Sequence, residues 1–151
     1  MRGFRILTFV TLASLSACGG DDAPQDQRNR VTGADSVQAA LTQYDAAAFD
    51  TIAWEAPEDA VVRGSVVFSY SCVRCHGRFA QGDGGFVSQG DTLRPPDVTV
   101  PDWRFLGDLE GLRQFIYTGS ENGMPHWGLE GLKYRDVDAV ARFLLEGLNR
   151  G

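Results

Sequence analysis

The sequence predicts an all-α domain with about three core helices, and three observations support this prediction. Apolar residues recur at helical spacing in the segments 58–71 and 135–148, and a capping residue and a stop glycine bound a third helix over 109–117. Five glycines and three prolines between residues 77 and 101 indicate loops. No β-rich segment stands out. We therefore expect helices joined by long loops around something other than a large side-chain core.

Residues 1–17 are typical of an export signal and are excluded from the fold. Arg2 and Arg5 form a basic start, and residues 6–15 form an apolar run of about ten residues. A transmembrane helix needs about twenty. The tetrapeptide Leu-Ser-Ala-Cys that ends at Cys18 resembles the lipobox of bacterial lipoproteins, which predicts a lipoprotein signal peptide and lipidation of Cys18. The alternative is an ordinary secretory signal with an incidental cysteine.

Two further segments come before the domain proper. Residues 18–34 are polar with few large apolar groups, which predicts a flexible tether. Residues 35–55 predict a helical extension that either packs on the domain or is only partly ordered. Its apolar residues at helical spacing are Val37, Leu41, Tyr44 and Ala48. The domain itself is expected over residues 56–151.

The ends of the three core helices carry local signals. Pro57 comes before the first helix, where its missing amide hydrogen is not needed. Asp108 can cap the second helix, and Gly119 is placed to end it. The apolar face of the third helix consists of Val137, Val140, Ala141, Leu144 and Leu148.

The pentapeptide Cys72-Val73-Arg74-Cys75-His76 predicts a covalent c-type haem site. Cys72 and Cys75 are three residues apart, so both thiols lie on one face of a helical turn. There they can form thioethers with the two vinyl groups of haem. The imidazole of His76 is then the proximal ligand of the iron.

Other uses of these two cysteines fit the sequence less well. A structural disulfide would leave His76 without a role. A thioredoxin-like redox motif needs a strand before it. Zinc needs about four ligands, and His126 alone would have to complete the set.

Met124 is the strongest candidate for the sixth ligand of the iron. Once the signal is removed, it is the only methionine, and His126 is the only histidine besides His76. Met124 lies between Gly123 and Pro125 in a loop, which favours ligation over the filling of a core gap. Ligation by His126 and an open position remain alternatives. A His/Met pair favours electron transfer, whereas an open position would support gas binding or peroxide chemistry.

Residues 56–151 resemble the class I monohaem cytochromes c of bacteria. The matching motifs occur in the expected order and are Cys72–Gly77, Gly82–Gly84, Arg94–Asp97 and Gly123–Pro125. The resemblance implies a cytochrome c-type fold around one haem c. It implies attachment through Cys72 and Cys75, with His76 and Met124 as the iron ligands.

The resemblance also covers helix packing. Gly64 and Phe68 resemble the glycine/aromatic pair on the N-terminal helix of the family. Val140 and Phe143 resemble the aliphatic/aromatic pair on the C-terminal helix that crosses it. A glycine at position 64 lets the two helices approach closely, because it has no Cβ.

One contact around the haem is implied by the resemblance alone. The carbonyl of Pro95 or Pro96 is expected to accept the Nδ1 proton of His76 and so to fix the imidazole. Further candidates for the haem wall or for propionate binding, which plain packing or solvation explains equally well, are Trp103, Trp127, Tyr117, Arg94 and Arg104.

The charge of the chain excludes one class of partner. Removing residues 1–17 leaves 12 basic and 20 acidic residues, a net charge of −8 before any haem propionates. Nucleic-acid binding is therefore not expected. An acidic surface favours electropositive redox partners.

These observations predict an exported electron carrier with one haem c, held on a bacterial membrane by a lipid anchor and facing the periplasm or the cell exterior. Its expected partners are membrane or periplasmic redox proteins, and we expect no bond-breaking catalysis. The first alternative is a permanent monohaem subunit of a larger membrane oxidoreductase, such as a quinol-oxidising complex or a terminal oxidase. A five-coordinate haem enzyme or sensor is the second.

Overall fold

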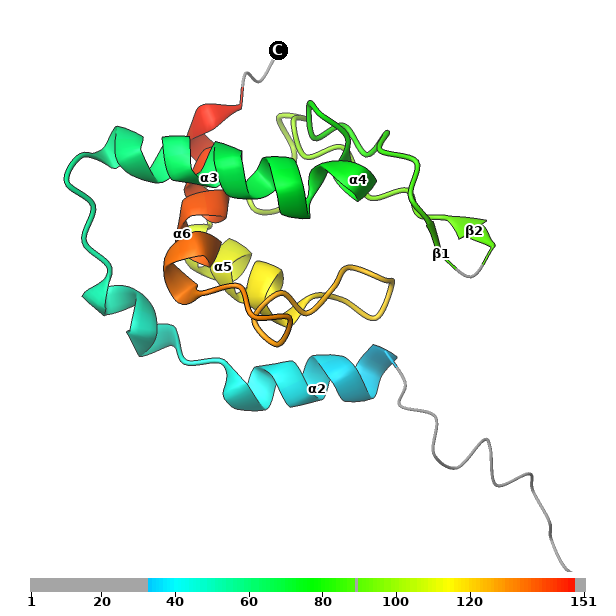
Figure 1. Ribbon diagram of the computed structural model, residues 1–151, viewed down its shortest axis with the longest axis horizontal. Coiled ribbons are helices and arrows are strands. Elements are labelled where there is room, and N and C mark those ends of the chain that lie inside the picture. The colour runs from blue at the N-terminus through cyan, green and yellow to red at the C-terminus, as the bar shows by residue number, and fades with distance from the viewer. Residues whose placement is uncertain (1–32, 89, 149–151) are drawn as a thin grey trace, which may run out of the picture. The chain divides into compact units, whose positions relative to one another are not determined.

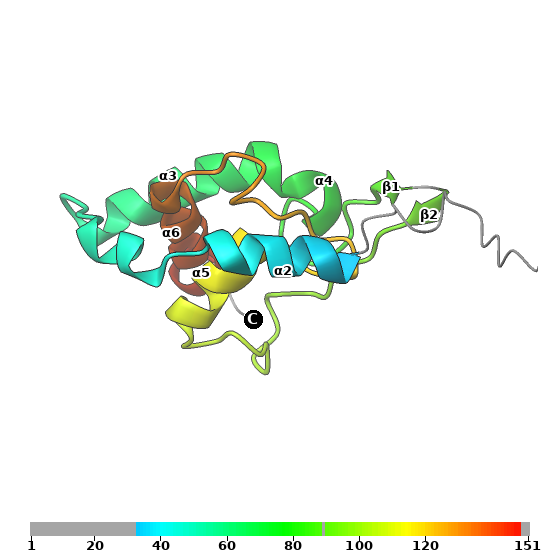
Figure 2. The ribbon, with the colours of Figure 1, turned by 90° about the horizontal axis from the view of Figure 1, so that it is seen from below.

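Three helices form the core. The computed structural model describes residues 33–88 and 90–148. Helix α3 spans Pro57–Ser71, α5 spans Leu109–Thr118 and α6 spans Tyr134–Arg142. Figures 1 and 2 show α6 crossing α3, and α6 also contacts α5. The all-α prediction is confirmed.

The predicted signal peptide, Cys18 and most of the predicted tether lie outside the described residues. Helix α2 begins at Gly33, so the last two residues expected in the tether are helical. Among the described helices, none is both long and apolar enough to cross a membrane.

Helix α3 packs against α6 at a glycine, as the sequence predicts. An added Cβ on Gly64 would lie 2.0 Å from the carbonyl oxygen of Ala139 and 2.6 Å from the Cβ of Phe143. One helical turn later, the rings of Phe68 and Phe143 lie 5.4 Å apart. No other residue would allow this approach without moving one of the helices.

The boundaries of α5 follow the predicted signals. The carboxylate of Asp108 accepts the amide hydrogen of Gly111 at 2.8 Å, which caps the first turn. Gly119 follows the last turn with φ = +68°, a backbone conformation that favours glycine.

The last helix differs from the prediction of one regular helix over 135–148. Helix α6 continues as a π-helical turn, η2, over Phe143–Gly147. The amide of Phe143 is shared between the carbonyls of Ala139 and Val140, a bifurcated bond of the kind that is common where an α-helix ends. An added Cβ on Gly147 would lie 2.7 Å from the side chain of Val61, so this turn also packs tightly on α3.

The N-terminal extension forms two short helices instead of one. Helix α2 covers Gly33–Gln43, and a 3₁₀ helix, η1, covers Ala46–Thr51. Asp45 separates them, because its carboxylate accepts the amide hydrogen of Ala47 and caps η1. Phe49 of η1 is buried in the core cluster. The hydroxyl of Tyr134 accepts the Asp45 amide hydrogen at 2.8 Å, which ties the extension to α6.

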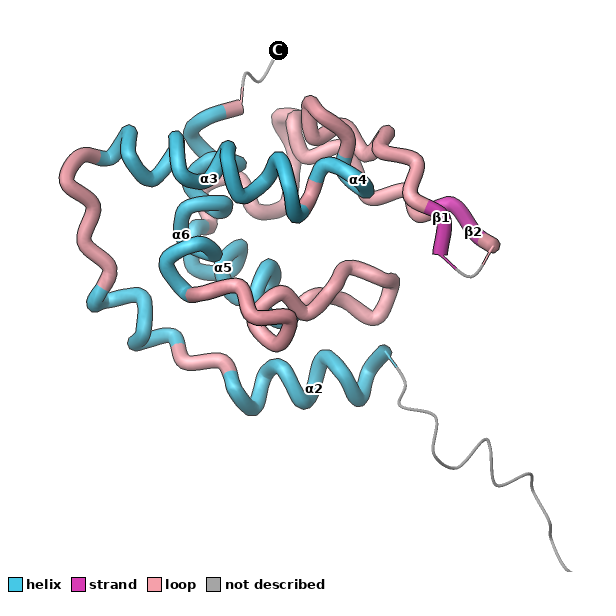
Figure 3. The backbone as a smooth tube through the Cα atoms, in the orientation of Figure 1, coloured by secondary structure: helices cyan, strands magenta, loops and turns pink. Residues whose placement is uncertain are grey.

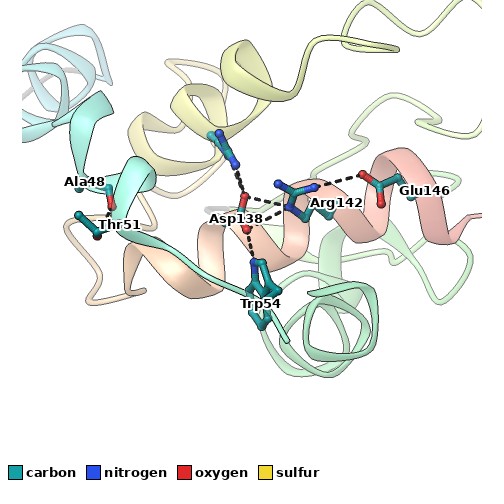
Figure 4. A network of polar contacts seen from close by, with 7 residues as sticks. Ala48, Thr51, Trp54, Asp138, Arg142 and Glu146 are labelled. Atoms are coloured by element: carbon teal, nitrogen blue, oxygen red, sulfur yellow. Dashed lines mark hydrogen bonds and ion pairs between the residues drawn. The ribbon is translucent and has the colours of Figure 1, made fainter. Parts of the chain in front are cut away.

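A second attachment of the extension uses a fully buried carboxylate. Asp138 of α6 has 0% exposure. It accepts hydrogen bonds from the indole Nε1 of Trp54 at 2.6 Å, from Arg142 at 3.2 Å and from Arg113 of α5. Figure 4 shows Trp54 and Arg142 converging on it. Asp138 therefore joins the extension, α5 and α6 at one point.

The region between residues 77 and 101 is mostly loop, but it contains a small hairpin that the sequence did not predict. Strand β1 (Val87–Ser88) pairs with β2 (Asp91–Thr92) in antiparallel register. Gly90 lies in the two-residue connection with φ = +93°, a conformation that tight hairpins need. Figure 3 shows these strands beside the otherwise helical and looped chain.

Candidate functional site

A cavity of about 460 Å³ lies between α3, α5, α6 and the loops that join them. Its wall is mostly apolar. The lining residues are Phe68, Cys72, Cys75, His76, Leu93, Arg94, Pro95, Pro96, Val98, Trp103, Arg104, Phe105, Leu112, Phe115, Ile116, Ser120, Asn122, Gly123, Met124, Val140 and Leu144. A close-packed interior leaves few voids larger than a water molecule, so a space of this size indicates a binding site.

The predicted haem-attachment residues form one wall of the cavity. Helix α3 ends at Ser71, and the short helix α4 covers Val73–His76. The carbonyl of Cys72 accepts the amide hydrogens of Cys75 at 3.1 Å and of His76 at 2.9 Å. These bonds close a single helical turn, so the two thiols and the imidazole face the cavity together.

Burial sets the protonation of these three side chains. It raises the pKa of the Cys72 thiol to about 12 and also raises the pKa of Cys75, partly offset by the Arg74 charge. Burial lowers the pKa of His76, which favours the neutral imidazole that can bind a metal. Neither cysteine is in a disulfide, and the element before Cys72 is a helix rather than a strand.

Met124 reaches the same cavity from the loop after α5. The amide of Ser120 donates to the Met124 carbonyl at 3.1 Å, and the Met124 amide donates to the Ser120 hydroxyl at 3.3 Å. Gly123, with φ = +101°, lets the chain turn just before the methionine. The structure therefore brings Cys72, Cys75, His76 and Met124 to one cavity.

His126, the other candidate for the sixth ligand, is not among the lining residues. Its Nδ1 hydrogen-bonds to the carbonyl oxygen of Thr118 in the last turn of α5. This contact directs one ring nitrogen of His126 to the backbone. The described residues contain no cluster of three or more His, Cys, Asp or Glu side chains able to hold a metal ion.

The weaker candidates divide into two groups. Trp103, Arg94 and Arg104 line the cavity, whereas Trp127 and Tyr117 do not. Arg104 lies over the rings of two aromatic residues at the cavity wall, with its guanidinium carbon 4.3 Å and 4.5 Å from their centroids. Arg104 therefore covers part of the aromatic wall.

The hydrogen bond expected from His76 to a proline carbonyl is not formed among the described residues. Pro95 and Pro96 line the cavity, but the Pro95 carbonyl oxygen lies against Gly82 instead. An added Cβ on Gly82 would come within 2.0 Å of that oxygen.

Several wall residues were missed by the sequence reasoning. Leu112 and Ile116 are four residues apart on α5, so helical periodicity could have identified them. Phe105 and Phe115 pack with ring centroids 5.1 Å apart, a contact that no local pattern reveals. Ser120 has no sequence signal at all.

The residues at this site fit a covalently bound c-type haem. The cavity is large and apolar, as a porphyrin requires. Two thiols lie on its wall for thioether bonds, with one imidazole and one thioether sulfur to bind iron.

Comparisons with known proteins agree with this chemistry. A family model described as "Cytochrome C oxidase, cbb3-type, subunit III" matches residues 59–144. The cbb3-type cytochrome c oxidase subunit CcoP of Cereibacter sphaeroides is 28% identical over 93 residues, which cover 55% of this chain and 29% of CcoP. The subunit FixP of Bradyrhizobium sp. is 31% identical over 97 residues, which cover 57% of this chain and 30% of FixP.

The match spans less than a third of the length of these curated relatives. No solved structure matches the chain. The matched region begins at residue 59, so α2, η1 and Trp54 lie outside it.

Proposed function

The chain belongs to the cbb3-type cytochrome c oxidase subunit III family, and on this premise we propose that it is a haem c electron-transfer component of a membrane terminal oxidase. The relatives are named as oxidase subunits, which favours a fixed subunit over the free carrier expected first. We propose one haem c in this chain, since the sequence holds one Cys-x-x-Cys-His motif.

One observation carries this proposal: four side chains of matching chemistry line one cavity. Cys72 and Cys75 would hold the haem through thioether bonds, and His76 and Met124 would bind its iron. When bound, haem c supplies a one-electron ferric/ferrous couple.

The residues around this group define what the site can do. Partial burial lowers the pKa of His76, which favours the neutral imidazole that binds metal without losing a proton. With Met124 as the second protein ligand, no coordination position is left for a substrate, which supports electron transfer rather than substrate chemistry. Leu112, Ile116 and Val140 exclude water from the interior wall, which favours the less charged, reduced state.

Spectroscopy of the protein purified from a host that matures c-type haem tests the ligand set. The wild type should carry covalent haem and show the weak long-wavelength band of methionine-ligated ferric haem. Met124→Ala should lose that band and bind carbon monoxide when reduced, whereas the matched control His126→Gln should keep the band. Covalent haem with rapid carbon monoxide binding in the wild type would instead support a five-coordinate enzyme or sensor. A chain without covalent haem would refute the proposal.

The second candidate function is a free carrier on a lipid anchor. The lipobox at Cys18 and the polar sequence of residues 18–32 favour this candidate. A lipid on Cys18 would confine the domain to the surface of a membrane and raise its effective concentration near redox partners. We place the protein on the periplasmic or outer face of that membrane.

Purification from mild detergent separates the two candidates. A subunit should co-purify with other oxidase polypeptides in fixed stoichiometry, and a carrier should elute alone. Mass spectrometry of the purified chain should find lipid on Cys18, and Cys18→Ser should release the protein from membranes. An unmodified Cys18 in membrane-bound protein would refute the anchor but not the haem site.

A further inference from the structure

We propose that Ser120 is a positioning residue for Met124, and that its hydroxyl keeps the methionine sulfur at the cavity. This inference rests on the proposed role of Met124 as an iron ligand. Ser120 lines the same cavity and follows directly on the glycine that ends α5.

The loop that carries Met124 has little intrinsic stiffness. Gly119 and Gly123 both have positive φ, +68° and +101°. Glycine loses more conformational freedom on folding than any other residue, so a ligand on this loop needs other contacts to hold it. Pro125 fixes its own φ and favours an extended backbone at Met124, but it does not restrict residues 119–123.

Ser120 supplies contacts to both polar groups of the Met124 backbone. Its amide donates to the Met124 carbonyl at 3.1 Å, and its hydroxyl accepts the Met124 amide hydrogen at 3.3 Å. Its carbonyl also accepts the amide hydrogen of Gly123 at 3.3 Å. The two bonds to Met124 fix the peptide groups on either side of its Cα, which sets the direction of the Cα–Cβ bond from which the side chain reaches the cavity.

Only one of these bonds depends on the identity of residue 120. Any residue except proline could form the two backbone bonds, whereas the bond to the Met124 amide needs a side-chain oxygen. Threonine keeps that oxygen, and alanine and valine lack it. The hydroxyl is therefore the testable part of the arrangement.

The neighbouring contacts hold the base of the loop and do not replace this bond. An added Cβ on Gly119 would lie 2.5 Å from the Met124 carbonyl oxygen, so the loop folds directly over the end of α5. His126, two residues after Met124, hydrogen-bonds through its Nδ1 to the carbonyl oxygen of Thr118. On the outer side, Gly33 of α2 lies against the backbone of Glu121.

The test is the binding of imidazole to the oxidised holoprotein, because imidazole competes with the methionine sulfur for iron. Ser120→Ala should raise the apparent association constant about 2- to 10-fold, as expected for the loss of one partly buried neutral hydrogen bond. Ser120→Thr should bind imidazole like the wild type, and Ser120→Val should behave like Ser120→Ala. The Thr/Val pair differs only in the hydroxyl, so it tests the proposal even if Ser120→Ala matures poorly. Ser69→Ala, which removes a hydroxyl bonded to Val66 on α3, is the control and should have no effect.

Equal imidazole affinity in wild type, Ser120→Ala and Ser120→Val would overturn the role of Ser120 while leaving Met124 as the ligand. A wild type that binds imidazole as tightly as Met124→Ala would overturn both proposals, because the methionine would then not compete for iron. A rise in affinity with Ser120→Val but not with Ser120→Thr supports the proposal. That difference cannot come from side-chain shape alone.

Discussion

Helix α6 is buried on two sides, and the buried side chains on these two sides find their contacts in different ways. All five residues of Val137–Ala141 are buried. On one side, Asp138 already has hydrogen-bond partners from Trp54, Arg113 and Arg142. On the other, Val140 faces an apolar cavity of about 460 Å³.

On the Asp138 side of α6 the chain supplies all the contacts itself, whereas on the cavity side it leaves space for a bound group. A buried carboxylate needs its partners within the polypeptide, because it cannot be left unpaired. The cavity side has no such internal solution, since its side chains lack neighbours across the void. Loss of haem should therefore affect the cavity side directly, and mutations at Asp138 should leave the ligand set intact.

The largest expected effect is the loss of the haem. In a Cys72→Ser/Cys75→Ser variant the apolar cavity of about 460 Å³ would lack the group that fills it, so its wall would lose packing contacts and be exposed to water. We expect this loss to be a large part of the stability of a typical domain, about 5–15 kcal/mol. We expect this variant to lack cooperative thermal unfolding and a near-ultraviolet circular dichroism signal. A cooperative transition in the haem-free variant would show that the cavity collapses. It would contradict the inference that the cavity side of α6 depends on a bound group.

The next effect should come from Asp138→Ala. Removing one partner of a buried ion pair costs about 3–5 kcal/mol, because it leaves the other charges without compensation. Asp136→Ala is the matched control, since its pair with the 44%-exposed side chain of Arg63 is at the surface and contributes about 0–1 kcal/mol. Denaturant unfolding of both holoproteins measures the difference. The ligand bands in the spectrum should be unchanged in both variants, and a lost methionine band in Asp138→Ala would refute the separation of the two sides.

The two sides also differ in how far the sequence could predict them. The haem side depends on local motifs: Cys72, Cys75 and His76 fall within five residues, and Met124 lies in a short glycine/proline loop. Such motifs indicate the same chemistry whatever the tertiary fold around them, because the chemistry needs that spacing. The structure places all four at one cavity.

The polar side could not be predicted in this way. Trp54 and Asp138 are 84 residues apart, and Arg113 is 25 residues from Asp138. An aspartate within a helical pattern usually indicates a solvated position, since Asp is seldom fully buried. Only the tertiary packing of the extension and α5 around α6 makes Asp138 a buried residue.

Irregular elements were missed for a related reason. The π turn η2 follows from close packing of Phe143 and Gly147 on α3, which a periodic pattern of apolar residues does not encode. The split between α2 and η1 did have a local signal, because Asp45 is a typical cap. The apolar residues at helical spacing on both sides of Asp45 led instead to the prediction of one helix.

A smaller effect is expected from Trp54→Phe, which removes one hydrogen bond to Asp138 and keeps an aromatic ring. A hydrogen bond to a charged group contributes about 1.5–3 kcal/mol. The ring contact with the Arg135 guanidinium, 3.9 Å from the ring centroid, should persist. We therefore expect faster amide hydrogen exchange in residues 45–55 with an unchanged haem spectrum. Trp127→Phe is the control, because the Trp127 indole donates no hydrogen bond among the described residues. Equal exchange rates in the two variants would argue that the Trp54 hydrogen bond to Asp138 does not hold the extension on α6.

The smallest effect concerns the loop that forms the outer wall of the cavity. The Asp97 carboxylate accepts the Thr99 hydroxyl at 2.6 Å and the Thr99 amide at 2.8 Å, which lowers the pKa of Asp97. Because the folded pKa is below the unfolded value of about 4, this contribution to stability is present above that pH. It is lost as the pH falls through the folded pKa. Asp97→Asn cannot titrate, so the wild type should lose more stability than this variant between neutral pH and about pH 3. Unfolding curves at both pH values measure that difference, and Asp102→Asn serves as a control at an exposed acid nearby. Parallel pH profiles for wild type and Asp97→Asn would mean that backbone geometry holds the turn and that the charge of Asp97 adds nothing to stability.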